Sequence, residues 1–89
     1  MAHKSQAELR DSLEEAAAQV PVGDTYAHYK SPDQTYTVTG HVVMEATDTV
    51  GIIYQANYGE HISFVRVLDS WLAHVEHDGK SVPRFSKVS

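Results

Sequence analysis

The spacing of the apolar residues changes at Gly23, and this change constrains the fold more than any other feature of the sequence. Before Gly23, apolar residues recur at helical spacing, whereas after it short alternating runs are separated by turn residues. Several short alternating segments joined by tight turns are typical of a small barrel or sandwich. The 89 residues are enough for one domain, and they predict a mostly-β fold with a helical N-terminal extension.

Residues 5–20 are predicted to form a helix. Ser5 and Glu8 have the spacing of a capping box, and Pro21 ends the helix because proline lacks an amide hydrogen. The apolar stripe of this helix is narrow and rich in alanine, so the helix needs a surface to pack on. We expect it to cover an open end of the domain. The alternative is that it pairs with a second copy of the chain, as a homodimer, or with a partner protein.

The β segments are bounded by turn and strand signals. Ser31-Pro32-Asp33 is expected to be a turn, because proline is pre-set for its first central position. Gly40 lies within the longest strand, where a glycine marks a bend. Asp78-Gly79 predicts a hairpin, and Pro83 places the last strand at an edge. The expected strands are residues 25–30, 35–46, 50–58 and 62–67, followed by a helical turn at Leu68, Trp71 and Leu72 and a hairpin at residues 73–85.

A helical turn directly before the last strand is a feature of SH3-like barrels. We therefore expect a small SH3-like β-barrel at residues 23–85. A helical extension at residues 1–22 precedes it, and a C-terminal tail at residues 86–89 follows it.

Composition excludes several classes of protein. The absence of cysteine rules out disulfides, thiolate metal sites and a cysteine nucleophile, and it favours the cytoplasm because small secreted domains are usually disulfide-bonded. The polar N-terminus contains no signal-peptide core, and the densest apolar stretch, residues 50–54, is too short to cross a membrane. The net charge of -5 opposes general binding to phosphate backbones, so RNA is not favoured as a partner.

Several short motifs follow one another in a specific order. Residues 23–30 read GDTYAHYK, and Tyr36, Val38 and Gly40 follow in a Y-x-V-x-G pattern. Later come YQANYG at 54–59, FVRV at 64–67 and PRF at 83–85. In this order and spacing, the chain resembles a bacterial family named domain of unknown function 1653. The resemblance implies a small bacterial domain without an established activity.

The chain departs from that family's pattern at three places. Asn57 stands where the family has an apolar residue, and Phe64 and Val67 replace its Trp and Pro. The family's His-Ser-Glu stretch is here Met44-Glu45-Ala46. Any chemistry of that stretch in relatives is therefore not implied for this chain.

Aromatic residues form the first candidate constellation, since SH3-like barrels often carry an aromatic groove for proline-rich, methylated or stacked ligands. Alternation places Tyr26 and His28 on one face and Tyr29 on the other, so most of these residues are expected in the core and rim. Tyr26, Tyr54 and Tyr58 are the candidates for a groove. The full set is Tyr26, Tyr29, Tyr36, Tyr54, Tyr58, Phe64 and Trp71.

Cationic residues form the second constellation. Arginine presents a rigid fork of donors that fits carboxylate or phosphate. If Arg66, Arg84 and His28 converge, they form a small anion pocket in an acidic protein. The alternative is that the two arginines form structural ion pairs with Asp69, Glu45 or Glu76. The lysines and arginines between Gly23 and Phe85 are Lys30, Arg66, Lys80 and Arg84.

The histidines do not have the spacing of a metal site, so we expect no metal and no cofactor. His74 and His77 fall on opposite faces of a strand, and no His-Glu-x-x-His pattern is present. His28 alone lies within a motif and is the weak candidate for a general base. No nucleophile or nucleotide-binding loop motif occurs, so an enzyme is the less favoured class. The six histidines are His3, His28, His41, His61, His74 and His77.

Three functions remain open from the sequence. The favoured one is a binding module for a small anionic or nucleotide-like ligand, an exposed RNA segment, or an acidic segment of a protein partner. The second is a small hydrolase or transferase with His28 as base and Arg66 and Arg84 as the anion clamp. The third is an oligomerisation or scaffold protein acting through the N-terminal helix. The expected ligand-binding residues are Tyr26, His28, Tyr54, Tyr58, Arg66, Trp71 and Arg84.

Overall fold

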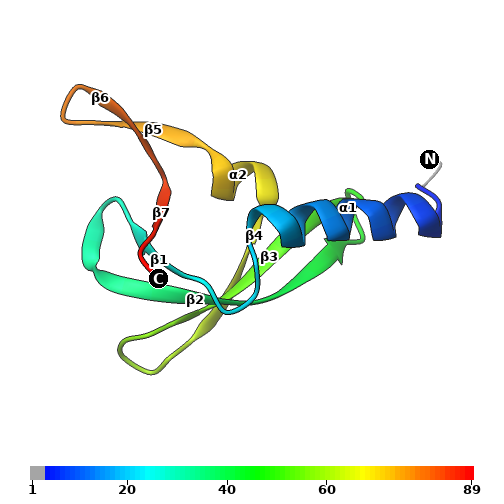
Figure 1. Ribbon diagram of the computed structural model, residues 1–89, viewed down its shortest axis with the longest axis horizontal. Helices are drawn as coiled ribbons and strands as arrows, with labels where there is room; N and C mark the ends of the chain where they lie inside the picture. Colours follow the sequence, from blue (N-terminus) through cyan, green and yellow to red (C-terminus); the bar gives the residue numbers. More distant parts are fainter. Residues whose placement is uncertain (1–3) are drawn as a thin grey trace.

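The protein combines one N-terminal helix with an antiparallel sheet and a separate hairpin (Figure 1). The computed structural model describes residues 4–89, so His3 lies outside the described residues. The mostly-β class with a helical N-terminus is confirmed. In chain order the elements are α1 (Gln6–Gln19), β1 (Thr25–His28), β2 (Ser31–Met44), β3 (Thr49–Ala56), β4 (Ser63–Val67), α2 (Leu68–Leu72), β5 (His74–His77), β6 (Lys80–Pro83) and β7 (Phe85–Lys87).

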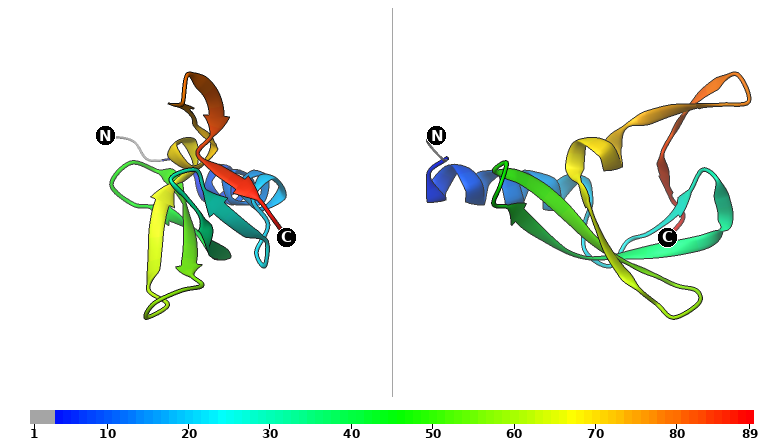
Figure 2. Two further views of the ribbon diagram at one scale, coloured as in Figure 1. Left: turned by 90° about the vertical axis from the view of Figure 1, so that its left-hand side faces the viewer. Right: turned by 180° about the vertical axis from the view of Figure 1, so that it is seen from behind.

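The main sheet is open. Its strand order is β4-β3-β2-β1-β7, so β4 and β7 are the two edges and do not pair with each other. The closed barrel expected from the sequence is therefore not observed within residues 4–89. The hairpin β5–β6 forms a second sheet, and α2 leads into it from above the main sheet (Figures 1 and 2).

Helix α1 begins and ends as its sequence predicts. The Ser5 hydroxyl accepts a hydrogen bond from the Glu8 backbone N–H at 3.1 Å, and the Glu8 carboxylate accepts one from the Ser5 N–H at 3.0 Å. This reciprocal capping box lowers the pKa of Glu8. At the other end, Ala16 and Val20 are buried, which fixes the helix to β2 and β3. The expectation that α1 packs on the domain is borne out by this burial.

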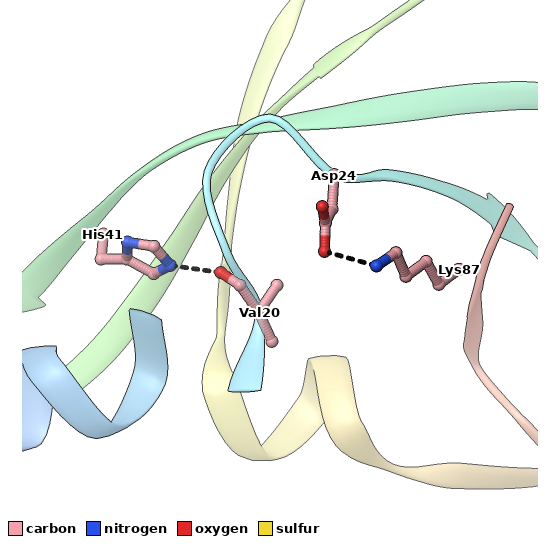
Figure 3. A network of polar contacts seen from close by, with 4 residues as sticks. All are labelled: Val20, Asp24, His41 and Lys87. Atoms are coloured by element: carbon pink, nitrogen blue, oxygen red, sulfur yellow. Dashed lines mark hydrogen bonds and ion pairs between the residues drawn. The ribbon is translucent and has the colours of Figure 1, made fainter. Parts of the chain in front are cut away.

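Polar contacts connect the end of α1, and the segment that follows it, to the sheet (Figure 3). Nε2 of His41 on β2 donates a hydrogen bond to the carbonyl of the helix C-cap, Val20, at 2.6 Å. Lys87 on β7 and Asp24 before β1 form an ion pair at 3.3 Å. A carbonyl at a helix C-terminus has no partner within the helix, so the His41 contact satisfies a group that the helix itself leaves open.

Replacing His41 with alanine is expected to lower the free energy of unfolding by about 1 kcal/mol, because one hydrogen bond to the helix end is lost. Chemical denaturation followed by circular dichroism measures this change. His74→Ala is the matched control, since His74 is an exposed histidine on β5. Equal stability of the two variants would show that the His41 contact does not hold the helix.

The long strand β2 contains the bend predicted at Gly40. The pairing of β2 with β3 shifts register between Val38 and Gly40, which is a β-bulge. A second irregularity separates the pairs Ala27–Thr35 and His28–Ser31. The intervening residues 32–34 have no partner in β1. The prediction of a turn at Ser31-Pro32-Asp33 is therefore wrong, because the chain turns at Tyr29 and Lys30. Pro32 lies in the unpaired part of β2, where the missing N–H of proline costs no hydrogen bond to β1.

The C-terminal segment confirms one prediction and adds a strand. Asp78 and Gly79 both have positive φ angles, 53° and 78°, as the expected two-residue hairpin turn requires. After Pro83 the chain returns to the main sheet as β7, which pairs with β1. Residues 86 and 87, which the sequence analysis placed in the tail, belong to this strand.

The core lies between the main sheet and α2. Trp71 of α2 stacks on Phe85 of β7, with ring centroids 3.9 Å apart and planes inclined by 7°. Tyr26 and Tyr54 present their ring edges to Trp71. Helix α2 is thereby fixed over the sheet by aromatic contacts, and its position sets the position of the arginines described below. The buried cluster is Val20, Tyr26, Val38, Ile52, Tyr54, Trp71 and Phe85.

Candidate functional site

A groove of about 410 Å³ opens beside the aromatic core, between the β1–β2 turn and strand β4. Aromatic rings form much of its wall, and a histidine from β1, a lysine from the β1–β2 turn and an arginine from β4 also line it. No aspartate or glutamate is among the described residues that line it, although the chain contains twelve acidic residues. The lining residues are His28, Lys30, Ser31, Gln34, Tyr36, Tyr54, Tyr58, Phe64, Arg66 and Phe85.

Ser70 on α2 anchors both arginines. Nη1 of Arg66 donates to the Ser70 hydroxyl at 3.0 Å, and Nε of Arg84 donates to the Ser70 carbonyl at 3.0 Å. Within residues 4–89 neither arginine forms an ion pair with a carboxylate. The ion pairs considered as the structural alternative are therefore not formed. Nε of Arg66 is buried and has no hydrogen-bond partner among the described residues.

The Arg66 guanidinium lies 5.5 Å from the centroid of the Phe85 ring, which gives it a cation–π contact. Neither a hydroxyl nor an aromatic ring carries a negative charge, so these two contacts leave the positive charge of Arg66 uncompensated. Arg66 can therefore offer that charge to an anion in the groove.

His28 lies at the cationic side of the groove. Burial lowers its pKa below the usual 6.5, and the positive charges of Arg66, Arg84 and Lys30 lower it further. Nδ1 of His28 accepts a hydrogen bond from the Lys30 backbone N–H at 3.2 Å, so the neutral ring carries its proton on Nε2. Arg66, Arg84 and Lys30 therefore lie close enough to His28 to act on its pKa.

Two tyrosine hydroxyls meet in the groove wall. The hydroxyls of Tyr36 and Tyr58 are 2.5 Å apart and share a hydrogen bond. Burial raises the pKa of Tyr36 to about 12, and the bond to Tyr58 contributes, so Tyr36 keeps its proton at neutral pH. Since a pair of hydroxyls uses only one of its two hydrogens internally, the other remains free to donate to a ligand.

The residues singled out from the sequence divide into three groups. His28, Tyr54, Tyr58 and Arg66 line the groove. Tyr26 and Trp71 lie in the core instead, with 8% and 2% of their surfaces exposed. Arg84 does not line the groove, but its charge acts on His28.

Sequence reasoning left out several groove residues. The sequence places Tyr36 and Lys30 in motifs and in the aromatic and cationic sets, but it does not indicate that they line the groove. Ser31 and Gln34 lie in no motif, and they belong to β2 because this strand begins at Ser31, four residues before the expected start at residue 35.

Other kinds of site are not apparent in the described part of the chain. Residues 4–89 contain no group of three histidine, aspartate or glutamate side chains placed to hold a metal ion. Among the same residues, no helix is both long and apolar enough to span a membrane.

Comparison with known proteins places the chain in a family. The chain is similar to a protein of the DUF1653 family from Bordetella bronchiseptica, whose crystal structure aligns with a TM-score of 0.62 and 29% sequence identity over 72% of this chain and 82% of that one. A search of curated proteins found no match. The model of the family described as protein of unknown function (DUF1653) matches residues 24–87. The chain therefore belongs to the DUF1653 family, as its sequence motifs indicated.

Proposed function

We propose that the protein is a binding module whose groove holds a small anionic ligand that carries a planar ring, as a mononucleotide does. The observation that carries this proposal is the charge distribution. The lining contains His28, Lys30 and Arg66 but no described acidic residue, in a chain with a net charge of -5. An acidic protein that concentrates cations in one groove attracts anions there and repels them elsewhere.

The aromatic part of the groove supports the planar component of the ligand. Phe64 is 43% exposed and lies 5.7 Å from the Tyr54 ring, with the two planes inclined by 33°. An exposed ring beside a cation can stack on a base or another planar group while the cation contacts the charge. The hydroxyl hydrogen that the Tyr36–Tyr58 pair does not use internally adds a donor to the wall of the groove.

A titration with three matched probes tests the proposal. Amide chemical shifts are recorded while adenosine, inorganic phosphate or adenosine 5′-monophosphate is added. We expect the monophosphate to bind most tightly, with shifts at Lys30, Tyr58 and Arg66, because it alone supplies ring and charge together. Equal shifts with all three probes, or shifts away from the groove, would contradict the proposal.

Affinity for an anion is expected to rise as the pH falls below about 6.5, because protonation of His28 adds a charge to the groove. The pKa of His28 is lowered in the free protein, so the rise continues below the usual histidine range. An aryl sulfonate is the probe, since its own charge stays constant between about pH 5 and pH 8. Calorimetry at several pH values should show a steep slope in the wild type and a shallower one in His28→Gln. The same slope in both would assign the effect to another group.

A further inference from the structure

Strand β4 is an edge strand, and no strand within residues 4–89 pairs with its outer side. It ends the sheet order β4-β3-β2-β1-β7, and Figure 2 shows it, in yellow, at the outer margin of the sheet. An edge strand presents a row of backbone donors and acceptors that match another strand. The outer side of β4 is therefore a surface whose natural occupant is an extended chain.

The hydrogen-bond pattern identifies which groups of β4 face outward. Ala56 N–H donates to the Ile62 carbonyl at 2.9 Å, so in an antiparallel ladder Phe64 and Arg66 are the next residues bonded to β3. Ser63, Val65 and Val67 then direct their backbone groups away from the sheet. Val67 is the N-cap of α2, and the carbonyl of an N-cap residue accepts the first hydrogen bond of its helix. Only the N–H of Val67 therefore remains to pair with another strand.

The side chains of β4 protect its edge only weakly. Natural edge strands are usually blunted by charged side chains, proline or a bulge, whereas β4 reads Ser-Phe-Val-Arg-Val and pairs regularly with β3. Its one charged side chain, Arg66, is held by Ser70 and lies over the Phe85 ring. Phe64, Val65 and Val67 are between 38% and 49% exposed. Exposed apolar side chains on such an edge favour a strand that covers them.

We propose that the occupant is β4 of a second copy of this chain, paired antiparallel about a two-fold axis through Val65. In this register the two Val65 residues exchange two backbone hydrogen bonds. The Val67 N–H of each copy donates to the carbonyl of the partner's Ser63. The two main sheets become one continuous sheet.

The complementarity of the side chains selects this register. The register centred on Val65 places Phe64 of each copy directly opposite the partner's Arg66, so an aromatic ring faces a cation at two symmetric positions. A shift of two residues towards α2 would place Arg66 opposite the partner's Arg66, and like charges directly opposite are destabilising. A shift the other way would pair Val67 with the partner's His61, whose φ of 56° is not that of a strand.

The same arrangement connects the interface to the groove. Phe64 and Arg66 point to the groove face of β4, because they line the groove. The two-fold axis runs perpendicular to the sheet, so both grooves open on the same face. Each groove then adjoins a Phe64 or Arg66 that belongs to the other copy.

The size of the interface sets its expected strength. Two strands of five residues each cover less surface than the roughly 1,200 Å² at the low end of stable complexes. We therefore expect monomer and dimer to exchange at micromolar concentrations rather than a permanent dimer.

Cysteine cross-linking tests the register directly. The chain has no cysteine, so Val65→Cys introduces a single thiol. Directly opposite residues of a hydrogen-bonded antiparallel pair have Cα atoms about 5.5 Å apart, within disulfide range. Under mild oxidation we expect a covalent dimer from Val65→Cys and little from Val22→Cys, the control at an exposed valine outside the sheet. Equal cross-linking of the two variants would overturn the proposal.

Sedimentation equilibrium tests the dimer itself. We expect the average mass of the wild type to rise with concentration. Val65→Lys should weaken dimerisation at least about tenfold, because it places like charges opposite each other. Val22→Lys should leave dimerisation unchanged. If Val65→Lys does not fold, as circular dichroism would show, the cross-linking result decides. Two results would overturn the proposal. One is a wild type that stays monomeric, which would leave β4 to a strand of another protein. The other is a dimer that Val65→Lys does not weaken.

Discussion

Replacing Trp71 with alanine is expected to lower the free energy of unfolding by about 3–5 kcal/mol. Trp71 is 2% exposed, stacks on Phe85 at 3.9 Å and receives the ring edges of Tyr26 and Tyr54. Its loss leaves a cavity at the contact that fixes α2 over the sheet. Because domains of this size have roughly 5–15 kcal/mol of stability in total, we expect an unfolding midpoint close to native conditions. Urea denaturation measures the change.

Two further variants separate this core role from a ligand contact. Trp71→Phe keeps a ring against Phe85 and should lose less stability than the alanine variant, while anion binding in the groove is retained. Phe64→Ala removes an exposed ring and should change the free energy of unfolding by less than about 1 kcal/mol. If Trp71→Ala were as stable as the wild type but bound no ligand, Trp71 would be a binding residue, as the sequence had suggested.

The predictions that succeeded rest on local signals. The capping box at Ser5 and Glu8, the Asp78-Gly79 hairpin and the bend at Gly40 each depend on residues close in sequence. The short helix containing Trp71 also followed from spacing alone. Such features are set by backbone chemistry that tertiary contacts do not change.

The predictions that failed depend on contacts between distant segments. Strand β7 exists because it pairs with β1, about sixty residues earlier, and nothing in residues 85–87 announces that pairing. The turn at Ser31-Pro32-Asp33 was wrong because proline also fits an unpaired stretch of strand. A closed barrel would need β4 and β7 to pair, and no local signal in the sequence shows whether two distant strands pair.

The candidate site was predictable in its residue types but not in its geometry. Arginine, histidine and tyrosine at motif positions indicated a groove, and His28, Tyr54, Tyr58 and Arg66 line the same one. The alternation of apolar and polar residues could not show that Trp71 lies in the core and not in the groove, because the position of Trp71 depends on how α2 packs. Nor could it show that Ser70 would hold both arginines in place of a carboxylate.

Arg66 is expected to contribute most to anion binding, so Arg66→Met should weaken the binding of adenosine 5′-monophosphate about 10- to 100-fold. This range corresponds to one charge-assisted hydrogen-bond site. Arg66 has no carboxylate partner among the described residues, and its Nε is buried without a hydrogen bond. The guanidinium therefore gains a full partner when an anion enters, whereas methionine offers a similar shape without charge. Calorimetry at fixed pH and salt measures the loss.

Two matched variants test whether binding depends on the guanidinium group at position 66 or only on the net charge of the protein. Arg66→Lys retains a positive charge but loses the rigid fork and the stack on Phe85, so we expect an affinity between those of the wild type and Arg66→Met. Arg10→Met removes an exposed arginine from α1 and the same formal charge from the protein, so it should leave affinity nearly unchanged. Equal losses in Arg66→Met and Arg10→Met would mean that net charge alone attracts the anion. A loss confined to Arg66→Met, in a variant that unfolds like the wild type, would place the anion in the groove.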